Sequence, residues 1–383
     1  MIYLDYNATT PCDPRVVEAM LPYFYEKFGN PSSREHAYGR TAAAAVEQAR
    51  ERVAELINAL PQEIVFTSGA TESNNLAITG VAMARVPART RIVTTPIEHK
   101  SVLEPGRRVD RFGCELVLLR VDRNGRVDLE YASEVITDKT ALVSVQAANN
   151  EIGTVQDIAT LAQLTHERGA FFHCDAAQAV GKIEVDVEAW GVDLLSLSGH
   201  KIYGPKGIGV LYVRGGRRRF PITPILYGGG HEDNLRSGTP NVPAIVGLGE
   251  ACRILSESWQ EEARRIANLR DRFEAALKSH LPSVIFNGDS KHRIPGTTNV
   301  TFPGIDAEAL IANAHELALS TGSACNSGAL EPSYVLTAIG MDRTQAYQTL
   351  RVGIGRFTTP DEIDSAVDHI VAAVNQIKAS LAN

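Results

Sequence analysis

The chain has 383 residues, of which 44% are hydrophobic and 22% are charged, and its formal net charge is −7. This composition is typical of a globular protein that can bury a large core, and it excludes a disordered chain. The negative net charge disfavours nucleic acid and anionic membranes as direct partners.

Cysteines are few and scattered, at positions 12, 114, 174, 252 and 325, and no two of them form a CxxC pair. This spacing excludes a disulfide scaffold and disfavours a thiolate zinc site. The first residues carry Asp5 and lack the basic and apolar regions of a signal peptide. No apolar run approaches the roughly 18 residues of a membrane span. We therefore expect a soluble, cytoplasmic protein with free thiols and no membrane partner.

Helical and strand patterns alternate over the first two thirds of the chain. An amphipathic helix is predicted over Thr41–Leu60, and the strand Ile64–Thr67 leads into a second helix at Gly69–Glu72. Further strands are predicted at Arg91–Thr95, Cys114–Val121, Ala141–Val145, Ala170–Asp175, Asp193–Ser198 and Gly209–Val213. Several of these are continuous apolar runs, which predicts a mostly parallel sheet covered by helices on both faces.

The pattern changes after about residue 245. The charged amphipathic stretch Ala244–Leu281 predicts one or two helices, and a helix over Asp361–Leu381 closes the chain. Short strands are expected between them, at Val284–Asn287, Thr297–Phe302 and Thr349–Gly353. We predict two domains: a large one over 15–245, and a smaller α+β domain made of 1–14 and 246–383.

One lysine and one aspartate follow apolar strands, at the sheet edge where open α/β sheets bind ligands. Lys201 comes just after a strand, and a solvated loop lysine is its ordinary interpretation. Asp175 ends the strand before it, and an acid there is either a helix N-cap or the partner of a buried cation. Enzymes that use pyridoxal phosphate need both groups, because an acid pairs with the pyridinium nitrogen while a lysine holds the aldehyde.

A candidate anion site precedes the second predicted helix. The segment Ser68–Ser73 runs from a strand into a helix, whose first N–H groups lack intrahelical partners. Small residues there allow close approach, and Thr71 adds a hydroxyl. Many strand-to-helix turns look like this, so the segment alone is weak support. The chain has no GxxxxGK[ST] motif, and a nucleotide P-loop is therefore not supported.

Short motifs of this kind extend almost from end to end: Leu4–Pro11, Gly29–Ser33, Ser68–Asn75, Glu98–Lys100, Asn149–Gly153, Asp175–Gln178, Ser198–Lys201, Gly228–Glu232, Arg236–Thr239, Ser323–Cys325 and Arg351–Phe357. Their order and spacing resemble the cysteine desulfurases of the class V aminotransferase family. The long loop that leads into Glu331–Leu336 resembles the housekeeping and nitrogen-fixation branch. The resemblance implies an α/β protein of fold type I, with a large pyridoxal-phosphate domain and a smaller α+β domain that carries the cysteine loop.

The resemblance also implies pyridoxal 5′-phosphate as the cofactor. Lys201 would bind its aldehyde, Asp175 would pair with the ring nitrogen, and His99 would stack on the ring. Gln178 would donate to the phenolic oxygen. The other implied cofactor-binding residues are Ala70, Thr71, Ser198 and His200, together with Asn150 and Thr239. Of these, Thr239 would reach the phosphate of the neighbouring subunit, which implies a homodimer.

Substrate and sulfur transfer follow from the same resemblance. Asn150 and Arg351 would hold the carboxylate of L-cysteine, a task that suits the planar fork of arginine. Cys325 lies among small polar residues, a composition that predicts a mobile surface loop. It would take the substrate sulfur as a persulfide and leave L-alanine, with His99 moving a proton. The other four cysteines are interpreted as packing residues.

Other interpretations remain open from the sequence. The same cofactor could serve transamination or selenocysteine lysis, and the chain could act mainly as a docking scaffold in a sulfur relay. Iron–sulfur cluster assembly, tRNA thiolation, DNA phosphorothioation and cofactor biosynthesis are all compatible destinations of the sulfur, through an acceptor protein. No metal site is expected, apart from Cys325 as a transient cluster ligand. The basic run Arg214–Arg219 predicts a solvated hairpin between strands or a docking patch for an acidic acceptor.

Overall fold

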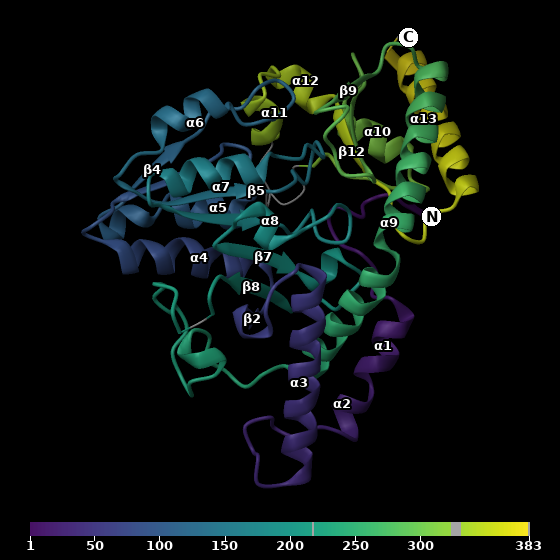
Figure 1. Ribbon diagram of the computed structural model, residues 1–383. Helices are drawn as coiled ribbons and strands as arrows, with labels where there is room; N and C mark the ends of the chain where they lie inside the picture. Colours follow the sequence, from purple (N-terminus) through teal and green to yellow (C-terminus); the bar gives the residue numbers. More distant parts are fainter. Residues whose placement is uncertain (217, 323–330, 382–383) are drawn as a thin grey trace.

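A seven-stranded sheet forms the centre of the larger part of the chain in this computed structural model, which describes residues 1–216, 218–322 and 331–381 (Figure 1). The strand order is β2-β8-β7-β6-β5-β3-β4. The strands are β2 (Ile64–Thr67), β3 (Arg91–Thr94), β4 (Glu115–Leu118), β5 (Thr140–Gln146), β6 (Phe171–Asp175), β7 (Leu194–Ser198) and β8 (Gly209–Val213). Only β8 runs antiparallel to its neighbours within this described sheet, so the prediction of a mostly parallel sheet is confirmed.

Helices cover both faces of this sheet because side chains alternate along its strands. In β2, Ile64 and Phe66 pack into one buried cluster and Val65 into another. The first cluster joins the sheet to α3 (Ala37–Leu56), α7 (Ile158–Glu167) and the first half of α9 (Val242–His280). The second joins it to α4 (Ala70–Arg85) and α5 (Lys100–Gly106). The shorter helices of this part are α1 (Pro14–Met20), α2 (Pro22–Tyr25), α6 (Leu129–Val135) and α8 (Val187–Trp190).

A second, smaller sheet has the order β12-β10-β9 and carries its own buried cluster. Its strands are β9 (Ile285–Asn287), β10 (Thr297–Thr301) and β12 (Thr349–Gly353), and α10 (Ala307–Asn313) and α13 (Pro360–Leu381) pack against it. The first strand, β1 (Ile2–Tyr3), pairs in parallel with β11 (Leu317–Ala318). Two short helices, α11 (Tyr334–Ala338) and α12 (Arg343–Tyr347), pack in a separate buried cluster with Ile97 and Ile152 of the larger part.

The helix α9 is one continuous helix of 39 residues that extends through both parts (Figure 1). Leu255 packs in the cluster of the large sheet and Ile266 in the cluster of the small sheet. The predicted division into 15–245 on one side and 1–14 with 246–383 on the other stays a prediction. The first half of α9, beyond residue 245, belongs to the larger cluster.

Two sequence expectations need correction. The helix predicted over Thr41–Leu60 is shifted toward the N-terminus, because the His36 side chain caps α3 by accepting the Gly39 N–H at 3.1 Å. The run Arg214–Arg219 is no hairpin between strands: no strand follows β8 before α9 in the described residues, which omit 217. Instead, Arg214 folds back and donates to the backbone oxygens of the segment before β7.

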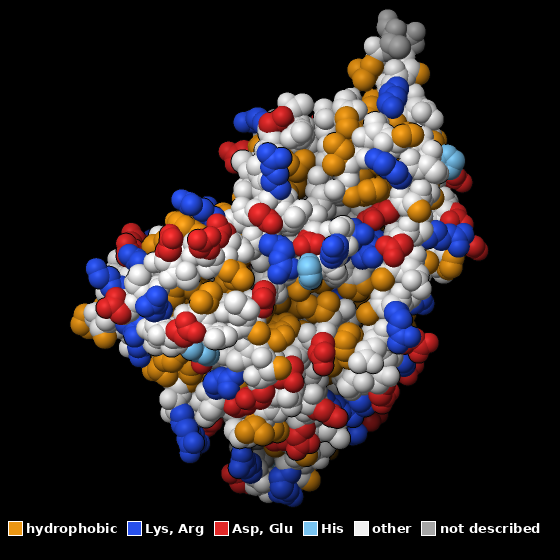
Figure 2. All heavy atoms as spheres, turned by 45° about the horizontal axis from the view of Figure 1, so that its top comes forward, with side chains coloured by type: hydrophobic (Ala, Val, Ile, Leu, Met, Phe, Trp, Pro, Cys, Tyr) orange, Lys and Arg blue, Asp and Glu red, His pale blue; other side chains and the backbone are white. Residues whose placement is uncertain are grey.

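Charged side chains of both signs are interspersed over the face of the molecule seen in Figure 2. Among the described residues, no helix combines the length and the apolar character needed to cross a membrane.

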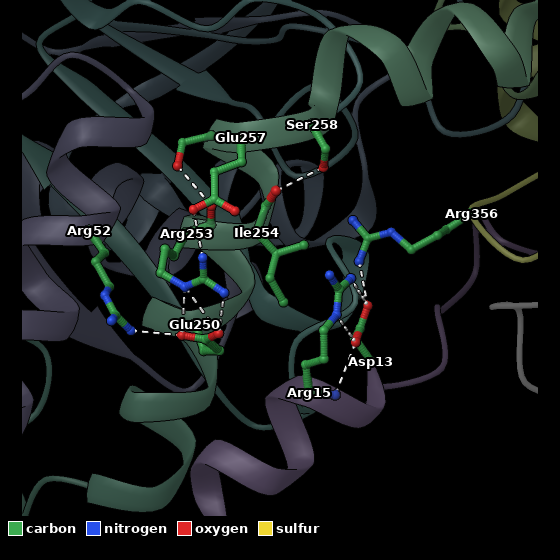
Figure 3. Close-up of polar contacts among 10 residues, drawn as sticks. Asp13, Arg15, Arg52, Glu250, Arg253, Ile254, Glu257, Ser258 and Arg356 are labelled. Carbon is green, nitrogen blue, oxygen red and sulfur yellow. Dashed lines mark hydrogen bonds and ion pairs between the residues drawn. The ribbon is translucent and has the colours of Figure 1, made fainter.

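A buried ion cluster connects segments that are far apart in the sequence. Asp13 caps α1 and accepts from Arg15 and from Arg356, whose Nη1 lies 2.9 Å from its carboxylate (Figure 3). The Arg356 guanidinium also pairs with Glu262 of α9 at 2.8 Å and lies 4.0 Å above the Tyr203 ring. Because Tyr203 comes two residues after Lys201, this cluster fixes the chain next to the candidate site.

Candidate active site

A cavity of about 480 Å³ lies at the carboxyl ends of β5, β6 and β7. It is the place where parallel sheets of this kind bind ligands. The predicted site residues that line it are Ala70, Thr71, His99, Asn150, Asp175, Gln178, Ser198, His200, Lys201 and Arg351. The structure thus brings together all the predicted site residues except Thr239 and Cys325.

Lys201 lies in a single turn of 3₁₀ helix directly after β7. Its Nζ donates to the backbone oxygen of Ala8 at 2.8 Å and also to that of Asn7. The N-terminal segment therefore holds the amine at the cavity wall. Neither Asn7 nor Ala8 was predicted as a site residue, although both lie in a recognised motif. Their contribution comes from backbone carbonyls, which no residue type signals.

Asp175 is the last residue of β6, and only 5% of this residue is exposed. One oxygen accepts from Asn74 Nδ2 at 2.7 Å, and the other accepts the Ala177 N–H at 3.0 Å. The residues after β6 form a turn, so Asp175 is not the cap of a helix. Asn74 also donates to Ser101 and was missed by the sequence analysis.

His99 is the N-cap of α5, and its Nδ1 accepts the Ser101 N–H at 3.1 Å. Burial lowers the pKa of His99, although the Asp175 charge acts in the opposite direction. The neutral ring is therefore favoured near pH 7. Since Nδ1 accepts a hydrogen bond, the proton of that neutral ring belongs on Nε2.

The predicted anion site lies at the N-terminus of α4. Gly69 caps this helix with φ of 150°, a backbone conformation that side chains with a Cβ rarely adopt. Ser68, Thr71 and Ser198 place hydroxyls around the same end of the cavity. His200 also lines the cavity, and its Nδ1 lies 3.1 Å from Thr9 Oγ1. Burial, together with the Lys201 and Lys206 charges, lowers the pKa of His200 to about 4.

These donors and acceptors fit pyridoxal phosphate at both ends. Free N–H groups at a helix N-terminus and several hydroxyls suit a phosphate, whereas Asp175 suits a protonated ring nitrogen. The side-chain oxygen of Asn150 is buried and has no hydrogen-bond partner among the described residues. A bound group would supply one.

Arg351 reaches the cavity from β12 of the small sheet, with 4% of the residue exposed. Its Nη2 pairs with Asp5 at 2.7 Å, and its Nη1 donates to the Asn150 backbone oxygen at 3.2 Å. The Nε atom has no hydrogen-bond partner in the described part of the chain. Arg351 and Asn150 thus lie side by side, as the prediction of a carboxylate site requires.

Two predicted residues do not line this cavity. Thr239 lies instead in a neighbouring cavity of about 170 Å³, which shares Ser68 and Gly207 with the first. Cys325 lies outside the described residues. Among the other cysteines, burial raises the pKa of Cys12, Cys114, Cys174 and Cys252, which disfavours a reactive thiolate at these positions.

Comparison with known proteins agrees with this geometry. Residues 2–365 match the class-V aminotransferase family. The chain is 50% identical over 377 residues to the cysteine desulfurase IscS of Ehrlichia chaffeensis, covering 98% of this chain and 92% of that protein. Among solved structures, a NifS-like protein matches with a TM-score of 0.91 at 36% identity, over 98% of this chain and 99% of that one. SspA in complex with cysteine matches with a TM-score of 0.84 at 38% identity, over 94% and 100%.

The match extends over nearly the whole chain in sequence and in fold, so the resemblance inferred from the motifs and the predicted fold class are both confirmed. This chain belongs to the class-V aminotransferase family, in the group that contains the IscS cysteine desulfurases.

Proposed function

We propose that this chain is a pyridoxal-phosphate-dependent cysteine desulfurase, which converts L-cysteine to L-alanine and passes the sulfur on as a persulfide. The observation that carries the proposal is the cavity in which Lys201, Asp175 and Arg351 meet. The identity to the IscS enzymes and the cysteine found with SspA support the same substrate.

Pyridoxal phosphate, the cofactor of this family, would withdraw electrons from the substrate Cα when bound. In our proposal Lys201 would hold its aldehyde and would move the proton at the substrate Cα. Asp175, held by Asn74 and Ala177, would pair with the ring nitrogen. Thr71, Ser198 and His200 would hold the phosphate, and Gln178 would donate to the phenolic oxygen.

The substrate carboxylate would bind between Arg351 and Asn150, where the buried Arg351 Nε is a donor that has no partner among the described residues. His99 is suited to move a proton at the substrate thiol, because its neutral ring carries a proton on Nε2 and can exchange it. Arg351 is buried and donates to a backbone oxygen, and His99 is half-buried and accepts a backbone N–H, so neither residue needs to move far.

The sulfur transfer balances without a further oxidant. The Cys325 thiolate attacks the substrate sulfur, and the bond between that sulfur and Cβ breaks with its electron pair remaining on carbon. Two protons then complete L-alanine, one at Cβ and one at Cα. Cys325 keeps the sulfur as a persulfide, and an acceptor protein removes it for iron–sulfur cluster assembly or another thiolation pathway.

We further propose a cytoplasmic homodimer in which Thr239 completes the partner's phosphate site. Thr239 lies outside the main cavity of its own chain, which fits a role in a second copy. Near the start of α3, Phe24, Tyr25, Phe28 and Tyr38 each expose more than half of their surface, as residues of an interface do. On the face of the molecule shown in Figure 2, basic and acidic side chains are interspersed, so this face has no continuous basic surface for nucleic acid.

The purified protein tests this proposal with L-cysteine, by measuring alanine, pyruvate and sulfide in parallel. We expect a yellow protein that releases alanine, and a Cys325→Ala variant that keeps its colour and loses alanine release. Cys12→Ala is the matched control, because Cys12 is partly buried and outside the cavity, and it should retain activity. Normal persulfide turnover by Cys325→Ala would contradict the proposal, and 3-mercaptopyruvate in place of alanine would indicate transamination, because transamination leaves the sulfur on the carbon chain.

A further inference from the structure

Lys182 is a partly buried lysine with no role in the chemistry described above. It follows the turn after β6 and lines a small cavity of about 20 Å³ behind the main one, together with Asn7 and Lys201. It does not line the main cavity. Its Nζ donates to Gln178 Oε1 at 2.6 Å.

Gln178 connects this lysine to the main cavity. The residue is 5% exposed and lines that cavity, and its Nε2 donates to the Asn7 backbone oxygen at 2.8 Å. An amide placed the other way round would point Nε2 at the Lys182 ammonium and Oε1 at the Asn7 oxygen. Both contacts would be repulsive while Lys182 is protonated, so the protonated lysine together with the Asn7 oxygen fixes one orientation of the amide.

This orientation decides what Gln178 can offer a ligand. One Nε2 hydrogen is given to Asn7, and the other has no partner among the described residues. Gln178 therefore faces the main cavity as a donor, since Lys182 occupies its oxygen. A bound oxygen with negative charge is the natural acceptor for such a donor.

The position of Lys182 is an unfavourable one for a cation. Burial, with the Lys201 and Arg351 charges, lowers the pKa of Lys182 to about 7. An apolar side chain could fill the same space without the electrostatic cost of burying a cation. The contact with Gln178 gives the lysine a function in this place.

We propose that Lys182 is a positioning residue, which holds the Gln178 amide so that its Nε2 donates to the phenolic oxygen of the bound cofactor. The proposal rests on the proposed function only in that pyridoxal phosphate occupies the main cavity. Lys182 itself touches neither cofactor nor substrate.

The test is a double-mutant cycle on the visible absorption of the cofactor-loaded enzyme, titrated with pH in the absence of substrate. A donor at the phenolic oxygen stabilises its charged form and lowers the pH midpoint of the absorption change. Gln178→Ala and Lys182→Met should each raise this midpoint, by about one unit, because a hydrogen bond to a charged oxygen is lost or loosened. In the Gln178→Ala background, Lys182→Met should add less than about 0.3 unit.

Lys206→Met is the charge control, because Lys206 lines the main cavity and has no hydrogen bond to Gln178 among the described residues. Its effect on the midpoint should be the same with and without Gln178. Lys182→Arg keeps a charged donor and should keep the midpoint within about 0.3 unit of the parent. Lys182→Ala replaces Lys182→Met if the latter fails to fold, as judged by thermal unfolding.

Additive shifts from Lys182→Met and Gln178→Ala would overturn the proposal, because they would mean that Lys182 acts by charge alone. An unchanged midpoint in Lys182→Met would overturn it as well. A parent enzyme that takes up no cofactor and shows no visible band would instead refute the proposed function. The two failures are therefore distinguishable.

Discussion

Asn74 shows how one buried amide supports the chemistry of another residue. Its Nδ2 donates to Asp175 at 2.7 Å and to Ser101 at 2.8 Å, so it connects the acid at the ring-nitrogen end of the cavity with the residue whose N–H donates to His99. Hydrogen bonds to charged groups contribute about 1.5–3 kcal/mol each. Asn74 is thus expected to matter for cofactor affinity without touching the cofactor.

We predict that Asn74→Ala weakens the binding of pyridoxal phosphate by about tenfold, because Asp175 loses a donor that fixes its carboxylate. Equilibrium titration of the apoenzyme, followed by absorption, measures this affinity. The matched control is Asn75→Ala, since among the described residues the Asn75 side chain donates only to a backbone oxygen of its own helix. Equal losses in both variants would contradict the role given to Asn74.

At this scale the sequence predicted residues that act through a distinctive side chain, such as Lys201 and His99. It could not predict Asn74, because a helical asparagine looks the same whether it faces solvent or a buried acid. It also could not predict Asn7 and Ala8, whose backbone oxygens accept from Lys201.

The N-terminus of α4 is the element that the candidate phosphate site depends on. Gly69 enters this helix with φ of 150°, and a Cβ added there would meet only Ser198 Oγ, at 3.6 Å. Space is therefore not the constraint at this position. The constraint is the backbone conformation, because a residue with a Cβ would either be strained at this φ or adopt a different one.

We expect Gly69→Ala to lower the free energy of unfolding by about 1–3 kcal/mol and to weaken pyridoxal phosphate binding as well. Denaturant titration measures the first effect and apoenzyme titration the second. Gly191→Ala is the control: Gly191 also has a positive φ, of 68°, and a Cβ there would make only an ordinary contact with Ala162. The Gly191→Ala variant should be less stable than the parent and should bind pyridoxal phosphate with the same affinity. Unchanged affinity in Gly69→Ala would contradict the assignment of the phosphate to this helix end.

Element boundaries were predicted best for the short, fully buried strands. The strands β2 and β8 have the predicted limits, whereas α3 begins and ends earlier than its apolar pattern suggested. The reason is local: the His36 side chain caps the helix, and Asn58 adopts a positive φ of 55° just beyond its end. The single helix α9 could not be told from two, because its pattern is amphipathic over both parts of the molecule.

At the scale of the whole molecule, the ion cluster around Asp13 joins α1, α9 and the segment after β12. Hydrogen bonds from Arg15, and to a smaller extent from Arg356, lower the pKa of the Asp13 carboxyl to about 2, well below its ordinary value of 3.8. In the unfolded chain the carboxyl regains the ordinary pKa. The stability that this group contributes is therefore complete above about pH 4 and is lost as the pH falls toward 2.

Asp13→Asn should lower the free energy of unfolding at pH 7 by about 3 kcal/mol, because a buried ion pair loses one partner. The difference in the free energy of unfolding between the variant and the parent should shrink as the pH falls from 4 to 2. Denaturant unfolding at several pH values measures this difference. Asp364→Asn, which breaks an exposed pair with Arg272, should change stability little. A difference that stays constant down to pH 2 would contradict this account.

The pairing of the first strand with β11 has a consequence for how the protein is made. Ile2 lies opposite Leu317, and Asp5 pairs with Arg351, so the chain's first residues find their partners only near its end. On a ribosome that adds about 5–20 residues per second, the N-terminal segment must wait roughly 15–60 s for those partners. The contacts of Asn7 and Ala8 with Lys201 can form earlier in synthesis, whereas the pair between Asp5 and Arg351 cannot, so the site is completed only after Arg351 has been made.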